Sequence, residues 1–274
     1  MTSVAYPGPE GAHSAAACDK LFPDAEIVAL PSFEAVAAAV TRCEVEYGVL
    51  PMENTFAGPV APTHDLLYDS ALCIARQTTV GIRHALVGLE RIPREEIRVV
   101  RSHPMALDQC RELLAALPWA TAIAAPTTSG AAAQVAATGD RSEVAISSER
   151  AAQALGLVVI EDDVGDHHQV FTRFVAVATH LRLDRADDED WRIAFSFVTD
   201  HQPGALFRTL EPFARHGLDL VQLVSRPIPK TPWRYRFDAV LAGFPLEPVV
   251  SETLAELRTM TRELRVFGSY PVAG

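Results

Sequence analysis

A threonine lies inside an apolar segment beyond the middle of the chain, DHHQVFTRFVAVA. In the alternation of a β-strand, Thr172 and Phe174 share one face, and Phe171 and Arg173 share the other. Both faces are mostly apolar, so we expect the strand to be covered on both sides. The hydroxyl could simply bond to the backbone, since threonine has a high strand propensity, or it could face a reactive cleft. The segment by itself leaves both interpretations open.

Two polar segments in the first part of the chain follow short apolar runs. YPGPEGAHS contains Gly11 and Ser14 in a loop that lets backbone amides approach a ligand, although the lysine of a phosphate loop is missing. LPMENTFAGPVAPTHDLL places Glu53 and Asn54 where a strand is expected to end. Each segment could instead be an ordinary turn whose polar side chains satisfy nearby backbone groups.

Two later segments begin helices. VVRSHPMALDQC has Ser102 as the expected N-cap and Gln109 about two turns further on, and both could serve the helix alone. APTTSGAAAQVA has Thr127, Thr128 and Ser129 at the start of a helix with a small-residue face. Clustered hydroxyls and free amides at a helix N-terminus suit a carboxylate.

An α/β architecture is expected to position these segments. From residue 4 to about residue 160, short β-branched runs alternate with Ala- and Leu-rich helical segments, which predicts a largely parallel sheet. Residues 77–90 are strand-like with no clear helix between their halves, which suits a crossover between two lobes. We therefore expect two α/β lobes with a cleft, and ligands in such folds gather at the carboxyl ends of strands.

A second domain is expected after an acidic segment. Five acids fall between residues 184 and 190, so residues 181–190 are predicted to be a solvated linker. The remaining residues, 191–274, have strand and helix patterns in the order β-α-β-β-α-β. That order is the ferredoxin-like plan.

Composition narrows the class of protein. With 274 residues, 49% apolar and 22% charged, the chain has the values of an ordinary globular protein. Its four cysteines are far apart, which predicts reduced core residues and a cytoplasmic location. The sequence has neither a leader-like segment nor an apolar run of about 18 residues, so neither export nor membrane spanning is indicated.

Charge and motifs exclude further classes of function. A net charge of −11 without a basic stripe argues against partners such as nucleic acid and anionic lipid. The sequence contains no nucleotide-binding fingerprint, no nucleophile elbow, and no metal-ligand spacing among its nine histidines. The residues alone therefore predict a cytosolic two-domain α/β protein whose polar cleft binds a small anion.

Taken in order, the segments resemble the prephenate dehydratase family. The family pattern includes a GPxGT(F/Y)S loop, a P(I/V)EN segment, an SHPQALxQC helix start, a TRF strand, and GAL and ESRP motifs. The matching segments here are GPEGAHS, PMENTFAGPVAPTHDLL, SHPMALDQC, TTSGAAAQVA, VAISSERAAQALGL, TRF, PGAL and VSRP. The match covers essentially the whole chain. It implies a two-lobed, periplasmic-binding-protein-like catalytic domain over 1–180, with lobes of about 1–80 plus 165–180 and 81–164, and an ACT domain over 191–274.

The resemblance implies a reaction and the residues that carry it. Prephenate would lose carbon dioxide and water to give phenylpyruvate, with no metal and no cofactor. Thr172 matches the threonine central to catalysis and is the candidate acid for the departing hydroxyl, with Phe171 and Phe174 expected to keep water out. The other residues expected in the cleft are Glu53, Asn54, Ser102 and Gln109 as catalytic residues, and Gly11, Ser14, Thr127, Thr128, Ser129 and Arg173 as substrate-binding residues.

The resemblance also implies regulation by an amino acid. ACT domains generally pair across a subunit interface, which predicts a homodimer or homotetramer with phenylalanine as effector. The residues expected to bind it are Gly204, Ala205, Leu206, Ser225, Arg226 and Pro227. Val224 replaces the glutamate of the ESRP motif, so we expect phenylalanine to bind weakly.

Three departures from the pattern bear on substrate choice. Ala12 and His13 replace a threonine and an aromatic residue in the first loop, and Met105 replaces a glutamine beside Ser102. DHHQVF replaces the family's Asn-containing approach to the threonine. The alternatives are an arogenate dehydratase or a prephenate decarboxylase that does not aromatise the ring. An alternative of another class is a non-catalytic protein that senses an amino acid.

Overall fold

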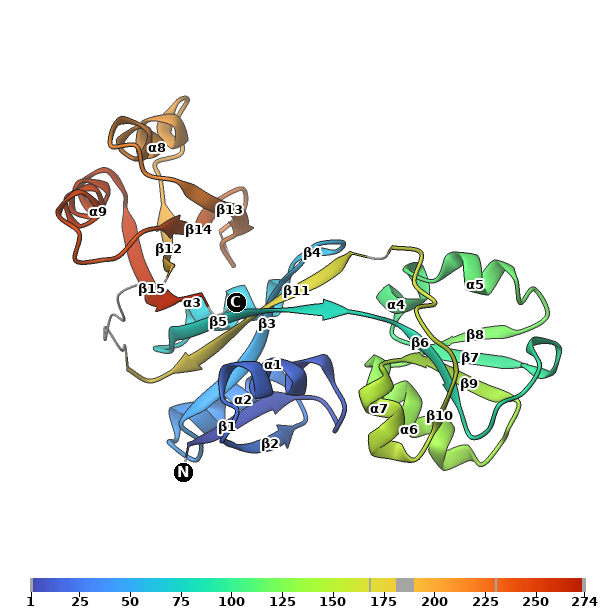
Figure 1. Ribbon diagram of the computed structural model, residues 1–274. Helices are drawn as coiled ribbons and strands as arrows, with labels where there is room; N and C mark the ends of the chain where they lie inside the picture. The colour runs from blue at the N-terminus through green and yellow to red at the C-terminus, as the bar shows by residue number, and fades with distance from the viewer. Residues whose placement is uncertain (1, 168, 181–189, 230, 273–274) are drawn as a thin grey trace. The chain divides into compact units, whose positions relative to one another are not determined.

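The computed structural model describes residues 2–167, 169–180, 190–229 and 231–272 (Figure 1). Internal contacts divide the chain into two compact units, each made of two segments. The first unit consists of Met1–Val60 and Thr79–Phe174, and the second of Ala61–Thr78 and Val175–Gly274. Except for Asp190, the expected linker lies outside the described residues. None of the helices in these ranges is long and apolar enough to cross a membrane.

A six-stranded sheet has the order β2-β1-β3-β11-β5, and β4 pairs with β3; the division into units falls within β5 and β11, and the rest of this sheet forms one lobe of the first unit. Its strands are β1 (Ser3–Pro7), β2 (Glu26–Leu30), β3 (Tyr47–Asn54), β4 (Gly58–Pro59), β5 (Cys73–Ile82) and β11 (Val170–Ala178). Helices α1 (His13–Leu21) and α2 (Phe33–Thr41) pack on β1 and β3, which are parallel. The loop between β1 and α1 therefore leaves the carboxyl end of a parallel strand, where a ligand site is expected.

The other lobe has a five-stranded sheet with the order β10-β6-β9-β7-β8. Its strands are β6 (Ala85–Gly88), β7 (Val99–Ser102), β8 (Thr121–Ala124), β9 (Glu143–Ser147) and β10 (Val158–Glu161). Strand β7 is parallel to β8 and β9, whereas β6 is antiparallel to β9 and β10. The sheet is thus mixed rather than largely parallel, because β6 directly follows β5 with no helix to turn the chain round.

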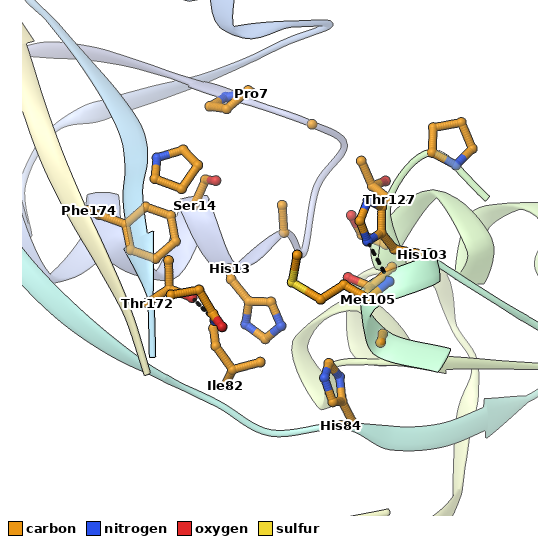
Figure 2. Close-up of a pocket in the computed structure, with 18 of the residues that line it drawn as sticks. Pro7, His13, Ser14, Ile82, His84, His103, Met105, Thr127, Thr172 and Phe174 are labelled. Atoms are coloured by element: carbon orange, nitrogen blue, oxygen red, sulfur yellow. Dashed lines mark hydrogen bonds between the residues drawn. The ribbon is translucent and has the colours of Figure 1, made fainter. Parts of the chain in front are cut away.

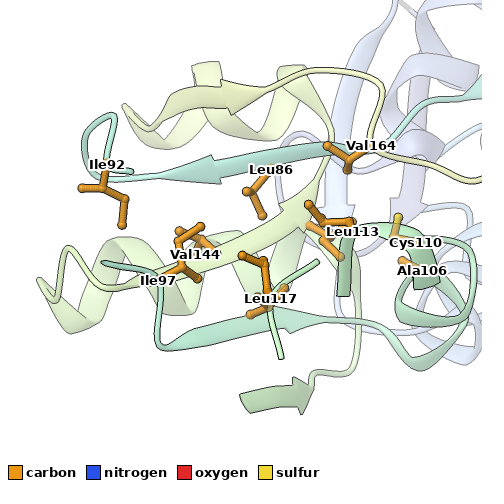
Figure 3. Close-up of a cluster of buried hydrophobic side chains, with 11 residues drawn as sticks. Leu86, Ile92, Ile97, Ala106, Cys110, Leu113, Leu117, Val144 and Val164 are labelled. Atoms are coloured by element: carbon orange, nitrogen blue, oxygen red, sulfur yellow. The ribbon is translucent and has the colours of Figure 1, made fainter. Parts of the chain in front are cut away.

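Two apolar clusters surround this second sheet. Figure 3 shows the first cluster, in which Leu86 and Val144 of the sheet pack with Leu113 of the helical segment that follows β7. The second cluster is rich in alanine and includes Ala131 and Ala152. The helices of this lobe are α4 (Pro104–Asp108), α5 (Arg111–Ala115), α6 (Thr128–Thr138) and α7 (Glu149–Leu155), and a 3-10 turn spans Arg94–Glu96. Small side chains let α6 and α7 lie close to the sheet, which fixes the positions of their first turns.

Side-chain caps mark where most of these helices begin. Ser32, Thr127 and Ser148 each accept a backbone N–H from the first turn of α2, α6 and α7, as their residue types favour. The N-cap of α4 is His103, whose ring accepts a backbone N–H, so the prediction that Ser102 is the cap is wrong. Ser102 is instead the last residue of β7.

The four cysteines are free, and two of them belong to the core. Cys18 and Cys110 are buried, whereas Cys73 is half-buried and Cys43 is exposed. Burial raises the pKa of Cys18 and of Cys110 to about 12, so their thiols stay protonated near neutral pH. The prediction that all four are core residues is therefore wrong for Cys43.

The second unit contains the predicted ferredoxin-like order. Its elements are β12 (Trp191–Val198), α8 (Ala205–Arg215), β13 (Leu220–Pro227), β14 (Tyr235–Ala242), α9 (Pro248–Met260) and β15 (Glu263–Pro271). The strands form an antiparallel sheet with the order β13-β14-β12-β15. Phe195, Phe213 and Leu257 lie in one buried cluster, which joins the sheet to α8 and α9. The β-α-β-β-α-β prediction is confirmed.

Helix α3 (Ala61–Asp69) also belongs to the second unit and is held to its sheet by a buried ionic network. His64 Nδ1 lies 2.9 Å from Asp238 Oδ2, and the Arg236 Nε–H donates to Asp238 Oδ1 at 3.2 Å. Asp65 accepts from Arg226 and from Arg236, each at 2.7 Å. The side chains of His64 and Arg236 are each only 1% exposed, whereas that of Asp65 is 44% exposed, so α3 is attached through one buried and one partly solvated contact.

Candidate active site

A cavity of about 340 Å³ lies in the first unit and is lined by residues of both lobes (Figure 2). Residues predicted for the site come together there from five separate segments of the chain. They are Ser14, Asn54, Gln109, Thr127, Thr128, Ser129 and Thr172. Ser14 and Thr172 are 158 residues apart in the sequence, yet both line this cavity. This is the arrangement that two lobes with a cleft between them predict.

The hydroxyl of Thr172 is bonded to a side chain rather than to the backbone. Asn54 Nδ2 donates to Thr172 Oγ1 at 2.9 Å, and both residues are 8% exposed. Asn54 is itself fixed, because its Oδ1 accepts the backbone N–H groups of Phe56 and Ala57, each at 2.9 Å. Since the threonine oxygen accepts this bond, its own proton is left to be donated to a ligand in the cavity.

Gln109 and His84 form a second buried pair on the other side of the cavity. His84 Nε2 and Gln109 Oε1 are 2.7 Å apart, which places the proton of the neutral imidazole on Nε2. His84 Nδ1 and Gln109 Nε2 are buried with no partner in the structure. Burial lowers the pKa of His84, although the bond to Gln109 opposes this shift.

A short segment before β11 holds the backbone of this pair. The Val164 N–H donates to the His84 carbonyl at 2.8 Å, and the Asp166 N–H donates to the Gln109 carbonyl at 2.7 Å. The Asp166 carboxylate accepts the backbone N–H of Arg111, the first residue of α5, at 2.7 Å. The backbones of His84 and Gln109 are therefore both hydrogen-bonded to this segment, which fixes the points from which their side chains extend.

Two helices of eight or more residues begin at the cavity. Helix α6 begins at Thr128, and its cap Thr127 and its residue Ser129 both line the cavity. Helix α1 begins at His13, and its N-cap Ala12 offers no side-chain acceptor to the first turn. Free amides and the positive end of the helix dipole favour an anion at each place.

The cavity wall carries little fixed charge. Among the described residues that line it, there is no lysine, arginine, aspartate or glutamate. Apolar groups such as Phe33, Ile82 and Phe174 complete the wall. An anionic ligand would therefore be held by neutral donors in surroundings of low polarity, where hydrogen bonds are strong.

Two predicted residues lie one position away from the cavity wall. Glu53 and Arg173 do not line it and instead face each other, with carboxylate and guanidinium atoms 3.3 Å apart. Strand alternation explains this arrangement, because Asn54 and Thr172 point to the face with the cavity and their neighbours point to the other face. Each side chain of the ion pair is more than a quarter exposed.

Three further residues have positions other than those predicted. Ser102 is fully buried, and its hydroxyl donates to the Ile146 carbonyl at 2.6 Å. The backbone carbonyl of Gly11 accepts a hydrogen bond from the Ser148 hydroxyl at 3.0 Å. The φ angle of Gly11 is +83°, and a Cβ atom at this position would lie 2.5 Å from Ala151 Cα, so the position requires glycine. Phe171 is 42% exposed and does not line the cavity, so the prediction that it excludes water is wrong.

Sequence analysis missed the histidines of the cavity as a group. His13, His84 and His103 all line it. His13 departs from the family pattern, and its place at the end of the first loop is the signal by which the sequence could have indicated it. Met105, a second departure, also lines the cavity and is 37% exposed.

Residues 4–181 match the family model described as prephenate dehydratase. The chain belongs to the prephenate dehydratase family. Arogenate dehydratase/prephenate dehydratase 2 of Arabidopsis thaliana is 33% identical over 278 residues, which cover 98% of this chain and 72% of that protein. The bifunctional chorismate mutase/prephenate dehydratase of Aquifex aeolicus is 34% identical over 273 residues, with coverage of 98% and 74%. Prephenate dehydratases are carbon–oxygen lyases, so the predicted class of enzyme is confirmed.

Two solved structures cover almost the entire chain. A prephenate dehydratase from Arthrobacter aurescens in complex with L-Phe has a TM-score of 0.87 at 27% identity, covering 98% of this chain and 89% of that one. GqqA, described as a novel type of quorum quenching acylase, has the same TM-score and identity and covers 98% and 97%. The two structures are described with different activities, so similarity of fold alone does not identify the activity.

Proposed function

We propose that this chain converts prephenate to phenylpyruvate, and the observation that carries the proposal is the Asn54–Thr172 pair on the cavity wall. The ring carboxylate leaves as carbon dioxide, and the electrons of the broken C–C bond enter the ring. The C–O bond to the ring hydroxyl breaks with its electron pair, and the departing oxygen takes up a proton, supplied through Thr172 and replaced from solvent, to form water. Thr172 donates a hydrogen bond to that oxygen, while Asn54 keeps its hydroxyl in position.

The same cavity offers places for the two carboxylates of prephenate. The first turns of α1 and α6 face it from different lobes, and each can receive an anion through backbone amides and hydroxyls such as Ser14 and Ser129. Aromatisation drives the reaction, so holding the substrate in dry surroundings supplies most of what the enzyme must add. In this mechanism, neither a metal nor a cofactor takes part.

Product analysis with the purified protein tests the proposal. Incubation with prephenate should give phenylpyruvate, and incubation with arogenate separates the two substrates named among the relatives. A dihydro product that keeps its hydroxyl would indicate a decarboxylase, and hydrolysis of an acylated amine would indicate a GqqA-like acylase. If neither prephenate nor arogenate were consumed, the proposal would be rejected in favour of a non-catalytic binding protein.

The ferredoxin-like part of the second unit is proposed to be an ACT domain that binds phenylalanine. Support comes from the L-Phe complex of the Arthrobacter relative, whose similarity extends over 98% of this chain. Gly204 has φ at +76° and precedes the free amides at the start of α8, next to Ala205 and Leu206. On β13, Ser225 and Pro227 are exposed, whereas Arg226 bonds to Asp65.

A homodimer or homotetramer through this domain is part of the same proposal. Strand β13 is at the edge of its sheet, and its side chains alternate between half-buried and exposed. Its exposed residues include Val221 and Leu223, each 40% exposed, which could pair with a second copy. The proposal keeps the domain bounds predicted from the sequence. These are a catalytic domain over 1–180, a linker over 181–190 and a regulatory domain over 191–274. The cytoplasmic location also remains a prediction.

A further inference from the structure

The proposed substrate carries two negative charges, yet the cavity has no permanently charged cation among its described lining residues. The protein as a whole adds a formal charge of −11, which opposes an approaching anion. Among the lining residues, the groups that can become cations near neutral pH are the three histidines, His13, His84 and His103. A dianion that enters this cavity would therefore find its charge partner among these rings.

Two of these rings form a pair that spans the lobes. His13 comes from α1 and His84 from the connection between β5 and β6, and Figure 2 shows both side chains at the cavity. Their ring centroids are 6.5 Å apart, with the planes at 78°. His13 Nε2 and His84 Nδ1 are both buried with no partner in the structure. Two unpaired ring nitrogens thus lie near each other beside a cavity built for an anion.

Burial favours the neutral form of both rings when no ligand is bound. Burial, together with the neighbouring His84, lowers the pKa of His13 to about 4. Burial also lowers the pKa of His84. A carboxylate placed beside either ring reverses the balance, because an opposite charge within about 4–6 Å favours the protonated imidazole. The third ring differs, since His103 Nδ1 already accepts the Met105 N–H at 3.2 Å.

We propose that His13 and His84 are the switchable cation of the site: one of the two rings takes a proton from solvent when the dicarboxylate binds and returns it when the product leaves. This inference rests on the proposed function, since it requires a dianionic substrate. It goes beyond the family pattern, in which an aromatic residue stands at the position of His13. The pair is thereby assigned a binding role for a substrate carboxylate that is separate from the role of Thr172.

Other charged groups near the pair are committed elsewhere or are exposed. Arg83, Glu149, Arg150 and Asp162 line a second hollow that also touches His13. Arg150 forms an ion pair with Asp19, and Arg83 and Asp162 are exposed to solvent, which screens their charge. On the side of His84, the Asp166 carboxylate accepts two backbone N–H groups at the start of α5.

The pH dependence of kcat/KM follows from this exchange of protons. Only the small fraction of free enzyme that is already protonated binds productively, so kcat/KM should fall up to tenfold per pH unit as the pH rises from 6 to 8. In the complex the substrate carboxylate raises the pKa of the ring, so kcat should change much less over the same range. This split separates a charge partner for binding from a group that takes part in the chemical step.

Steady-state kinetics with prephenate at pH 6–8 test the inference. We compare the wild type with His13→Gln, His84→Gln, the double variant, and His103→Asn as the matched control. Glutamine can still form hydrogen bonds but cannot become a cation, so the double variant should keep measurable turnover with a nearly flat kcat/KM profile. His103→Asn, in which asparagine can still cap α4, should keep the wild-type slope.

The outcomes separate this inference from the proposed function. Turnover with a sloping wild-type profile that flattens in the double variant supports the pair. Turnover with a flat wild-type profile, or with a slope that survives in the folded double variant, overturns the pair and leaves the dehydratase proposal intact. If the wild type consumed neither prephenate nor arogenate, the proposed function and the inference would both fall.

Discussion

Replacement of Arg236 by methionine should destabilise the second unit strongly, because the arginine neutralises a buried carboxylate. Its side chain is 1% exposed, and its Nε–H donates to Asp238, whose side chain is 4% exposed. In Arg236→Met, Asp238 keeps only His64 as a partner in a site that water does not reach. Breaking a buried ion pair from one side costs about 3–5 kcal/mol in the free energy of unfolding.

Arg226→Met is the matched control, because it removes the other guanidinium of the same network. The partner of Arg226 is Asp65, whose side chain is 44% exposed and can be solvated. Asp65 would also keep its bond to Arg236 at 2.7 Å. An ion pair with this exposure contributes about 0–1 kcal/mol, so the two variants should differ by about 2 kcal/mol or more.

Urea unfolding monitored by fluorescence measures the difference. Trp191 belongs to the second unit and is 4% exposed, whereas Trp119 and Trp233 are 47% and 80% exposed, so the emission shift on unfolding reports mainly on Trp191. Adding Asp238→Asn to Arg236→Met removes the unpaired charge and should recover part of the loss. Equal losses in Arg236→Met and Arg226→Met, or a loss below about 1 kcal/mol in Arg236→Met, would refute the reasoning.

Four other outcomes are expected. Thr172→Val should lower kcat by about two to four orders of magnitude while Thr172→Ser retains much more, and equal rates for wild type and the valine variant would remove Thr172 from the mechanism. Gln109→Ala should reduce activity far more than Glu53→Ala, since Gln109 lines the cavity and Glu53 does not; melting curves check that both variants remain folded. The pKa of His13 is lowered to about 4, so between pH 6.5 and 4 the unfolded chain takes up a proton and the folded chain does not. The free energy of unfolding therefore decreases as the pH falls. Between pH 7 and 5, urea unfolding should show a decrease about 2 kcal/mol larger for the wild type than for His13→Phe, and equal decreases would contradict the shift. Val224→Glu should strengthen inhibition by phenylalanine, and superimposable titration curves would show that this position does not set the response.

Local sequence predicted the elements well where the physical cause is itself local. Ser32 and Thr127 cap helices because a hydroxyl in the right place accepts an amide from the next turn, whatever the rest of the chain does. Ser102 has the same residue type but a different partner, the carbonyl of Ile146, which is 44 residues away in sequence. A serine that could cap a helix can thus bond instead to a backbone carbonyl that comes close only once the sheet has formed.

The candidate site shows the same division. The alternation of β11 predicts that Thr172 and Arg173 face opposite sides, but it does not say which side bears the cavity. The ionic network of α3 could not be predicted either, because a histidine and an aspartate on a short helix are typical of a solvated face. Their partners are Asp238 and Arg236, which lie more than 160 positions further along the chain.

Helix α3 also affects how the chain can be divided for engineering or recombination. It belongs to the second unit, yet it follows β4 after the single residue Val60, and β4 pairs with the strand that carries Asn54. A fragment that stops before Trp191 would keep His64 and Asp65 while losing Asp238, Arg226 and Arg236, which are their charged partners among the described residues. The second unit is thus not a detachable C-terminal part, and an exchange of this unit between relatives would have to transfer residues 61–78 together with residues 175–274.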